Sequence, residues 1–125
     1  MNALKPILLL FLGGGLGTVL RYIASKALNP LSSHFAWGTF GVNILGSLLL
    51  GLLVGYSLKH PQISQQDWYP FLAIGLCGGF TTFSSFALEN HNFLKNGQFM
   101  EFALYLSTSI VLGVLAIAAG VFISK

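Results

Sequence analysis

A segment rich in glycine, hydroxyl and phenylalanine residues is the part of the sequence best suited to chemistry. It reads Gly-Gly-Phe-Thr-Thr-Phe-Ser-Ser-Phe over residues 78–86. Evenly spaced phenylalanines usually pack in a core or face lipid, but an aromatic ring also has a positive edge. The ring edges of Phe83 and Phe86, beside the hydroxyls of Ser84 and Ser85, would suit a small, poorly polarisable anion. Because no full charge is involved, such an anion could be bound weakly enough to leave, as conduction requires.

Two adjacent glycines in this segment bear on its backbone. Gly78 and Gly79 weaken a helix at this point. A broken helix at membrane depth is tolerated only where it is buried in protein or lines a cavity, and the carbonyls freed by the break can coordinate a cation. The hydroxyl side chains allow a second interpretation, in which the helix only bends because they bond back to its own carbonyls.

The composition indicates that this segment lies in a membrane. Of the 125 residues, 54% are hydrophobic and 7% are charged, whereas a soluble domain has roughly a quarter charged residues. The net charge of +3 comes from basic residues scattered singly along the chain, which argues against a nucleic-acid-binding surface. No nucleophile–base pair, metal-ligand cluster or nucleotide-binding loop stands out, so we do not expect an enzyme.

Charged residues divide the chain into four apolar stretches separated by short polar connections. A helix needs about 20 residues to cross the hydrocarbon core of a bilayer. The sequence therefore predicts an all-α integral membrane protein with one domain over residues 1–125. Its four helices are expected at about 4–28, 36–58, 68–94 and 99–123.

Two polar residues lie within these spans or near their ends. Arg21 shares an i, i+4 stripe with Gly13 and Gly17, a face suited to helix packing. It either extends to the lipid headgroups or, as we favour, faces a watery cavity. Asn43 needs hydrogen-bond partners at mid-membrane depth, so it either joins helices together or lines a polar path.

The basic residues are balanced between the two sides of the membrane. With four spans, each side receives three of them: Lys5, Lys59 and Lys125 on the side of the termini, and Arg21, Lys26 and Lys95 on the other. A Lys/Arg excess normally fixes the orientation of a membrane protein. Without one, the chain could insert both ways up, and opposite copies could pair as an antiparallel dimer.

Three motifs together resemble one known family, the Fluc/CrcB fluoride channels. The glycine–hydroxyl–phenylalanine segment over residues 78–86 is similar to the central signature of that family. Further matches lie in the first two helices: Gly13-Gly14, Gly17 and Arg21-Tyr22, then Trp37-Gly38-Thr39, Val42-Asn43 and Gly46. The resemblance covers essentially the whole chain, although the fourth helix is matched only by position.

The resemblance implies a dual-topology, antiparallel homodimer in the inner (plasma) membrane that exports fluoride passively and protects against its toxicity. It implies a structural sodium ion at the dimer centre, bound by the main-chain carbonyls of Gly78 and Thr81 at a break in the third helix. The residues implied for the two fluoride pathways are Asn43, Phe83, Phe86, Ser84, Ser85 and Arg21, with Tyr105 and Ser109 as further lining residues.

Two other functions would fit a short four-span chain. A small multidrug exporter needs a membrane-embedded carboxylate in its first helix, but the acidic residues here are Asp67, Glu89 and Glu101. A non-transporting protein that assembles a larger complex would show no ion flux. The sequence leaves open whether Glu89 lies in a vestibule or only ends the third helix.

Overall fold

Helices account for nearly the whole of the computed structural model, which describes residues 3–125. The first two long helices are α1 (Leu4–Leu28) and α2 (Trp37–Lys59), and the last is α6 (Phe99–Ser124). The third span is built from successive pieces: α3 (Trp68–Pro70), the π-helical turn η3 (Phe71–Leu76), α4 (Cys77–Phe80) and α5 (Phe83–Lys95). Short 3-10 turns, η1 (Asn29–Leu31) and η2 (Pro61–Gln65), lie in the first two connections.

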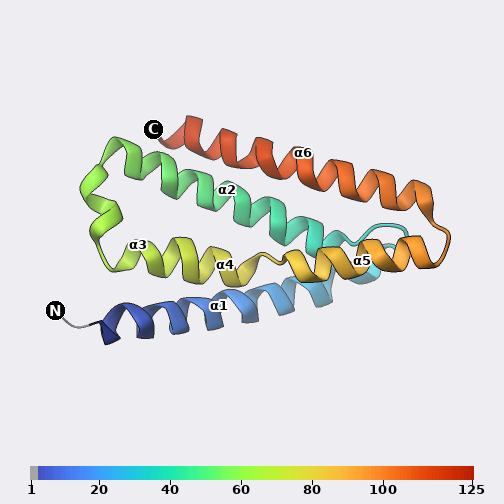
Figure 1. Cartoon of the computed structure of the whole chain (residues 1–125), viewed down its shortest axis with the longest axis horizontal. Coiled ribbons are helices and arrows are strands. Elements are labelled where there is room, and N and C mark those ends of the chain that lie inside the picture. The colour runs from blue at the N-terminus through green and yellow to red at the C-terminus, as the bar shows by residue number, and fades with distance from the viewer. Residues whose placement is uncertain (1–2) are drawn as a thin grey trace.

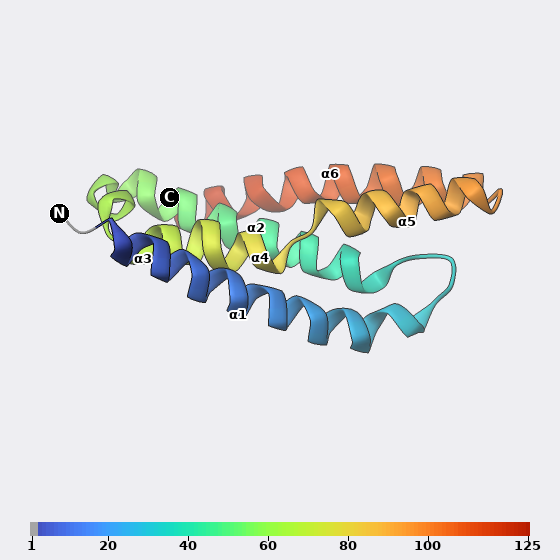
Figure 2. The same ribbon diagram turned by 60° about the horizontal axis from the view of Figure 1, so that its bottom comes forward.

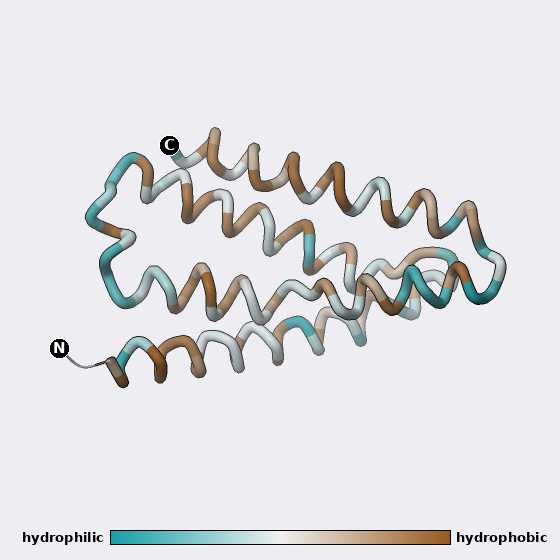
Figure 3. The backbone as a smooth tube through the Cα atoms, in the orientation of Figure 1, coloured by the Kyte–Doolittle hydropathy of each residue, from teal (hydrophilic) through white to brown (hydrophobic). Residues whose placement is uncertain are grey.

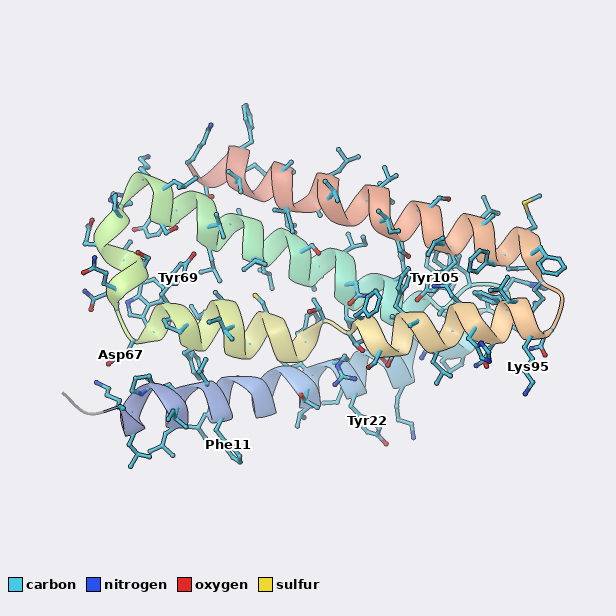
Figure 4. All side chains as sticks on the ribbon, viewed as in Figure 1. Phe11, Tyr22, Asp67, Tyr69, Lys95 and Tyr105 are labelled. Atoms are coloured by element: carbon cyan, nitrogen blue, oxygen red, sulfur yellow. The ribbon has the colours of Figure 1, made fainter. Side chains whose placement is uncertain are left out.

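Four of these helical runs are long and apolar enough to cross a membrane: Leu4–Leu31, Trp37–Lys59, Trp68–Lys95 and Phe99–Ser124. Their outer faces are covered with large apolar side chains, such as Phe11, which points away from the other helices (Figure 4). Hydrophilic residues gather in the connections and towards the end of α5 (Figure 3). This distribution is that of an α-helical, multi-pass membrane protein, whose outer surface meets lipid rather than water.

The four spans run side by side, and the third changes neighbours along its length. The start of α1, the C-terminus and the α2–α3 connection lie at one end, whereas the α1–α2 connection and the α5–α6 turn lie at the other (Figure 1). The first half of the third span, η3 and α4, packs against α1. Its second half, α5, packs against α6 (Figure 2), and α2 packs extensively against α6.

Glycines allow the helices to approach this closely. A Cβ atom at Gly17 of α1 would overlap the carbonyl oxygen of Leu76, and one at Gly120 of α6 would lie 2.7 Å from the amide nitrogen of Leu52 in α2. Neither backbone can retreat without moving its whole helix. Close approach of small residues is the usual means by which helices associate in lipid, where apolar side chains gain nothing by leaving the solvent.

The third span is interrupted between α4 and α5. Thr81 and Thr82 have extended backbone angles, with ψ of 162° and 120°, so the helical hydrogen-bond pattern stops and restarts there. Gly78 and Gly79 themselves remain helical within α4. The interruption therefore comes just after the glycine pair rather than within it, which differs from the position that the sequence suggested.

Candidate functional site

The interrupted backbone of the third span is held by one side chain of α2. The Asn43 Nδ2 group donates to the carbonyl oxygen of Thr82 at 3.1 Å, and the Thr82 N–H donates to Asn43 Oδ1 at 2.8 Å. The Thr82 hydroxyl oxygen in turn accepts a hydrogen bond of 3.1 Å from the Ser85 N–H and so caps the start of α5. The amide of Asn43 thus pairs with the backbone much as a neighbouring strand would.

These bonds deprive two carbonyls of their helical partners. In a continuous helix the Thr82 N–H would donate to the Gly78 carbonyl, and the Ser85 N–H to the Thr81 carbonyl. Both N–H groups are instead bonded to the side chains of Asn43 and Thr82. The carbonyl oxygens of Gly78 and Thr81 are neutral, hard ligands of the kind that bind sodium at broken helices. This local chemistry fits the cation that the sequence resemblance implied.

An open hollow lies beside the interruption, on the face of α2 and α4 that turns away from α1. It has a volume of about 290 Å³, and its lining includes Asn43, Gly46, Ser47, Gly78, Thr81 and Phe83. A Cβ atom built on Gly78 would meet nothing within 4 Å. Within residues 3–125, no lysine or arginine lines this hollow. It therefore combines amide, hydroxyl and aromatic groups without a full positive charge.

Aromatic rings lead from the hollow into the protein. Phe83 is 79% exposed at the open face, and its ring centroid lies 6.1 Å from that of Phe86, which is only 8% exposed. Phe86 lies 5.2 Å from the ring of Tyr105. Tyr105 is completely buried between α5 and α6 (Figure 4), and its ring also meets Phe93 edge-on. The hollow and the core are therefore joined by a continuous row of rings.

Glu89 stands at the inner end of this row. Its two carboxylate oxygens accept hydrogen bonds of 2.6 Å, one from the Thr39 hydroxyl and one from the Tyr105 hydroxyl. Three helices, α2, α5 and α6, are thereby joined through one acidic side chain. Glu89 also lines a second, polar hollow of about 250 Å³, together with Asn92 and residues of the α1–α2 connection. Glu89 is thus a bonded internal residue and does more than end the third span.

The structure brings some of the predicted pathway residues together and leaves others apart. Asn43, Phe83 and Phe86 line the hollow, and Tyr105 reaches it through Phe86. Ser84 is exposed, with its Oγ atom 3.4 Å from Thr82 Oγ1, and Ser85 lies in the first turn of α5. The Ser109 Oγ atom is buried without a hydrogen-bond partner among residues 3–125.

Arg21 lies apart from the residues that line the hollow. It projects from α1 onto the opposite side of α4, where its Nε atom donates to the Gly79 carbonyl at 3.0 Å. A bond to the main chain was not among the alternatives considered from the sequence, which were the headgroups or a watery cavity.

Sequence reasoning did not single out Thr39 as a site residue, although it is 2% exposed and bonded to Glu89. The available signal was its position one helical turn before Asn43, on the same face of α2. Thr82 was also missed as an individual residue. Its part depends on a backbone conformation that no side-chain pattern reveals.

The fold and the site define a multi-pass α-helical membrane protein with polar and aromatic groups arranged inside it. Comparison with known proteins identifies its kind. The model of the CrcB-like protein, Camphor Resistance (CrcB) family matches residues 8–121. The chain belongs to this CrcB family, a family of fluoride ion channels and not of enzymes.

Relatives named fluoride-specific ion channel FluC match over almost their full length. The protein from Phocaeicola vulgatus is 44% identical over 123 residues, which cover 98% of this chain and 100% of the relative. That from Flavobacterium psychrophilum is 43% identical over 123 residues, with 98% of each chain covered. One from Bacteroides fragilis is 42% identical over 126 residues, again with 98% of each covered.

Proposed function

We propose that this protein is a fluoride-selective channel that lets fluoride leave the cell down its gradient. The observation that supports this most directly is the hollow of amide, hydroxyl and phenylalanine groups around Asn43 and Phe83, which has no lysine or arginine in its lining within residues 3–125. The relatives that match over almost their full length are named as fluoride-specific ion channels. The groups that line the hollow and the names of the relatives therefore both favour fluoride as the conducted ion.

Selective conduction requires that groups along the pathway offset the free-energy cost of dehydrating the anion. Fluoride is strongly hydrated, so each water it loses must be replaced by a donor along the path. Asn43 Nδ2 has a second N–H beyond the one bonded to Thr82, and Ser84 is an exposed hydroxyl donor. The ring edges of Phe83 and Phe86 add weak positive potential. Ser85 and Ser109 add further hydroxyl groups to the proposed pathway. Tyr105 adds its ring, which lies beside that of Phe86, because its hydroxyl hydrogen is donated to Glu89.

We propose that the working unit is an antiparallel homodimer with two pathways. The hollow is open on one face, and Phe83 projects from that face with 79% of its surface exposed. A second copy in the opposite orientation would cover both. The equal number of basic residues on the two sides of the membrane is compatible with insertion in both orientations.

A sodium ion at the dimer centre would be held by main-chain oxygens. The carbonyls of Gly78 and Thr81 lack their helical partners, because the Thr82 and Ser85 amides are bonded elsewhere. Two such carbonyls from each copy would supply four ligands to the ion. When bound, the sodium ion contributes a fixed positive charge that favours an anion nearby.

The expected setting is the inner (plasma) membrane of the cell. In acid surroundings hydrogen fluoride enters by diffusion, ionises in the cytoplasm and is trapped there as the anion. A passive channel relieves this accumulation without any coupled ion. The first helix contains no acidic residue that would serve proton coupling. Export by this protein would therefore protect the cell against fluoride.

A flux experiment tests this function. The purified protein is reconstituted into liposomes loaded with fluoride or chloride, and efflux is followed with ion-selective electrodes. Fast fluoride efflux with negligible chloride efflux is expected. The Phe83→Ile variant should lose fluoride efflux because it removes a ring at the pathway. Phe11→Ile is the matched control, since Phe11 is 78% exposed on the lipid side of α1 and should be dispensable.

Two results would overturn the proposal. One is the absence of fluoride efflux from folded, reconstituted protein. The other is equal loss of efflux in the Phe83→Ile and Phe11→Ile variants, which would mean that the aromatic row has no special part in conduction.

A further inference from the structure

Arg21 contacts the main chain of α4, whereas the sequence resemblance implied that it lies beside an anion pathway. It lies one turn beyond Gly17 on the face of α1 that packs against η3 and α4. Its Nε atom donates to the main-chain carbonyl of Gly79 at 3.0 Å, in a partly buried position. This contact joins the side chain of α1 to the last turn of α4, directly beside the interruption of the third span.

The last carbonyls of a helix need partners, because no following turn supplies their amides. The helical first half of the third span ends at Phe80. Its Cys77 carbonyl accepts from the Thr81 N–H at 3.1 Å and from the Thr81 hydroxyl at 3.0 Å. The Gly79 carbonyl accepts from Arg21. A cation at a helix C-terminus is also favoured by the helix dipole, and a charge-assisted hydrogen bond is stronger than a neutral one.

The two glycines of this turn face opposite sides. A Cβ atom on Gly79 would overlap the Gly14 carbonyl oxygen of α1, whereas one on Gly78 would meet nothing within 4 Å and lies beside the hollow. Glycine backbones are the least restricted of all, so the direction of the Gly78 carbonyl needs fixing from outside. The bond from Arg21 fixes the next peptide unit, and thereby the turn that presents Gly78.

We propose that Arg21 is a positioning residue for the cation site: by capping the Gly79 carbonyl, it holds the Gly78 carbonyl in the direction needed to bind sodium. This inference rests on the sodium site proposed above. It assigns to Arg21 an action through the main chain of α4, separate from any effect of its charge on a passing anion.

The sign of the effect separates positioning from simple electrostatics. A guanidinium acting only through its charge would repel a nearby sodium ion, so removing it would strengthen sodium binding or leave it unchanged. A guanidinium that positions the carbonyl has the opposite effect, because its removal frees the turn. The two explanations therefore predict changes of sodium affinity in opposite directions.

The experiment measures sodium binding without relying on ion flux. The thermal unfolding of the detergent-solubilised protein is followed as sodium replaces N-methylglucamine at constant ionic strength. Arg21→Met should raise the sodium concentration for half-maximal stabilisation about tenfold. A tenfold change corresponds to the low end of the free energy that one hydrogen bond to a charged group usually contributes. Lys26→Met is the matched control, since Lys26 is an exposed cation on the same helix whose described contact is the ring of Tyr22. It should shift the requirement less than about twofold.

A conservative variant guards against a failure to fold. Arg21→Lys keeps the charge but loses the rigid, planar donor, so its sodium requirement should rise about threefold, between the natural chain and Arg21→Met. An unchanged or lower sodium requirement in either Arg21 variant would overturn the inference. So would an equal rise in Lys26→Met.

If the proposed sodium site does not exist, the experiment gives a different result from the one expected for a wrong role of Arg21. The natural chain would then show no sodium-dependent stabilisation, and this inference would fall with the site. Fluoride efflux from liposomes, measured separately, would decide whether the channel proposal stands without sodium.

Discussion

At the scale of single residues, the carboxylate of Glu89 organises the interior through short hydrogen bonds from Thr39 and Tyr105. An acceptor that loses one donor inside the protein bears the cost of its desolvation. Tyr105→Phe removes one donor and keeps the ring, so it should lower the free energy of unfolding by about 1–3 kcal/mol. Unfolding titrations in mixed micelles would measure this difference.

The matched control for this prediction is Tyr69→Phe. The Tyr69 hydroxyl makes a longer contact of 3.4 Å to the neutral Ser57 Oγ atom, so its loss should change stability by less than about 0.5 kcal/mol. Equal effects of the two tyrosine substitutions would contradict the importance assigned to the Glu89 contacts.

Asn43 allows a second prediction at this scale, because it uses both halves of its amide. The donor half meets the Thr82 carbonyl and the acceptor half meets the Thr82 N–H. In Asn43→Asp an ionised carboxylate would still accept but would face the Thr82 carbonyl without a donor. We expect a loss of about 1–3 kcal/mol in unfolding free energy, measured by the same titration.

Asn29 offers the corresponding control, because only its acceptor half has a described contact. Its Oδ1 atom accepts from the Gly38 N–H at 2.9 Å, a contact that an aspartate can also make. Asn29→Asp should therefore be nearly neutral. No loss in Asn43→Asp, or an equal loss in the two variants, would contradict the importance assigned to the Asn43–Thr82 pairing.

The sequence identified several of these residues but not their partners. Asn43 was recognisable as a polar residue in an apolar span, and Phe83 and Phe86 by their spacing among hydroxyls. The pairing of Asn43 with the Thr82 backbone was out of reach, since it depends on a local conformation and on the packing of two distant segments. For the same reason the sequence left the position of Glu89 open.

At the scale of elements, close contacts between α1 and the third span decide where the chain tolerates side chains. A Cβ atom at Gly17 would overlap the Leu76 carbonyl oxygen and lie 2.8 Å from the Phe80 nitrogen. Gly17→Ala should therefore force α1 away from α4 and cost about 1–3 kcal/mol in unfolding free energy. Because Arg21 lies on the same helix, the sodium requirement for stabilisation should rise as well.

Gly15→Ala is the control for this prediction. A Cβ atom there would meet nothing within 4 Å, and alanine is the better helix former, so stability should be unchanged or slightly higher. If Gly17→Ala were tolerated as well as Gly15→Ala, the helices would have to be less closely packed than the structure indicates.

The position of the interruption illustrates what sequence patterns miss at this scale. The glycine pair suggested a weak point at residues 78 and 79, yet both stay helical. Gly79 is small because it packs against Gly14 of α1. The helix stops where competing partners exist, since Asn43 takes the Thr82 N–H and the Thr82 hydroxyl caps α5. The low helix propensity of glycine indicated the region of the interruption, and hydrogen bonds from Asn43 and Thr82 determine the residues at which the helix stops.

At the scale of the whole molecule, the four apolar stretches were enough to predict four spanning helices, because length and hydropathy alone govern that property. The association of copies is different, since it depends on surfaces that a single chain leaves open. The open hollow and the exposed Phe83 make a second copy the natural occupant in our proposal. The orientation of the two copies then becomes the property to test.

Orientation should be shared equally between the two directions of insertion, since three basic residues lie on each side. Single cysteines at the exposed positions Gln62 and Asn96, at opposite ends of the bundle, would report it in a Cys77→Ser background. Each site should be labelled by an impermeant maleimide in about half of the molecules in intact cells, and fully after permeabilisation. Labelling of one site alone would contradict dual topology.

A shift in the charge balance should make the chain insert in only one of the two orientations, so that the need for both orientations in conduction can be tested. Gln62→Lys with Lys95→Gln makes the balance four against two in favour of the side of the termini, and Lys59→Gln with Asn96→Lys makes it two against four. Each double variant should insert mostly one way and lose most of its fluoride efflux in cells, because opposite partners become scarce. Co-expression of the two should restore efflux, since each supplies the orientation that the other lacks. Full efflux from either variant alone, with its orientation shown to be uniform, would mean that antiparallel pairing is not needed for conduction.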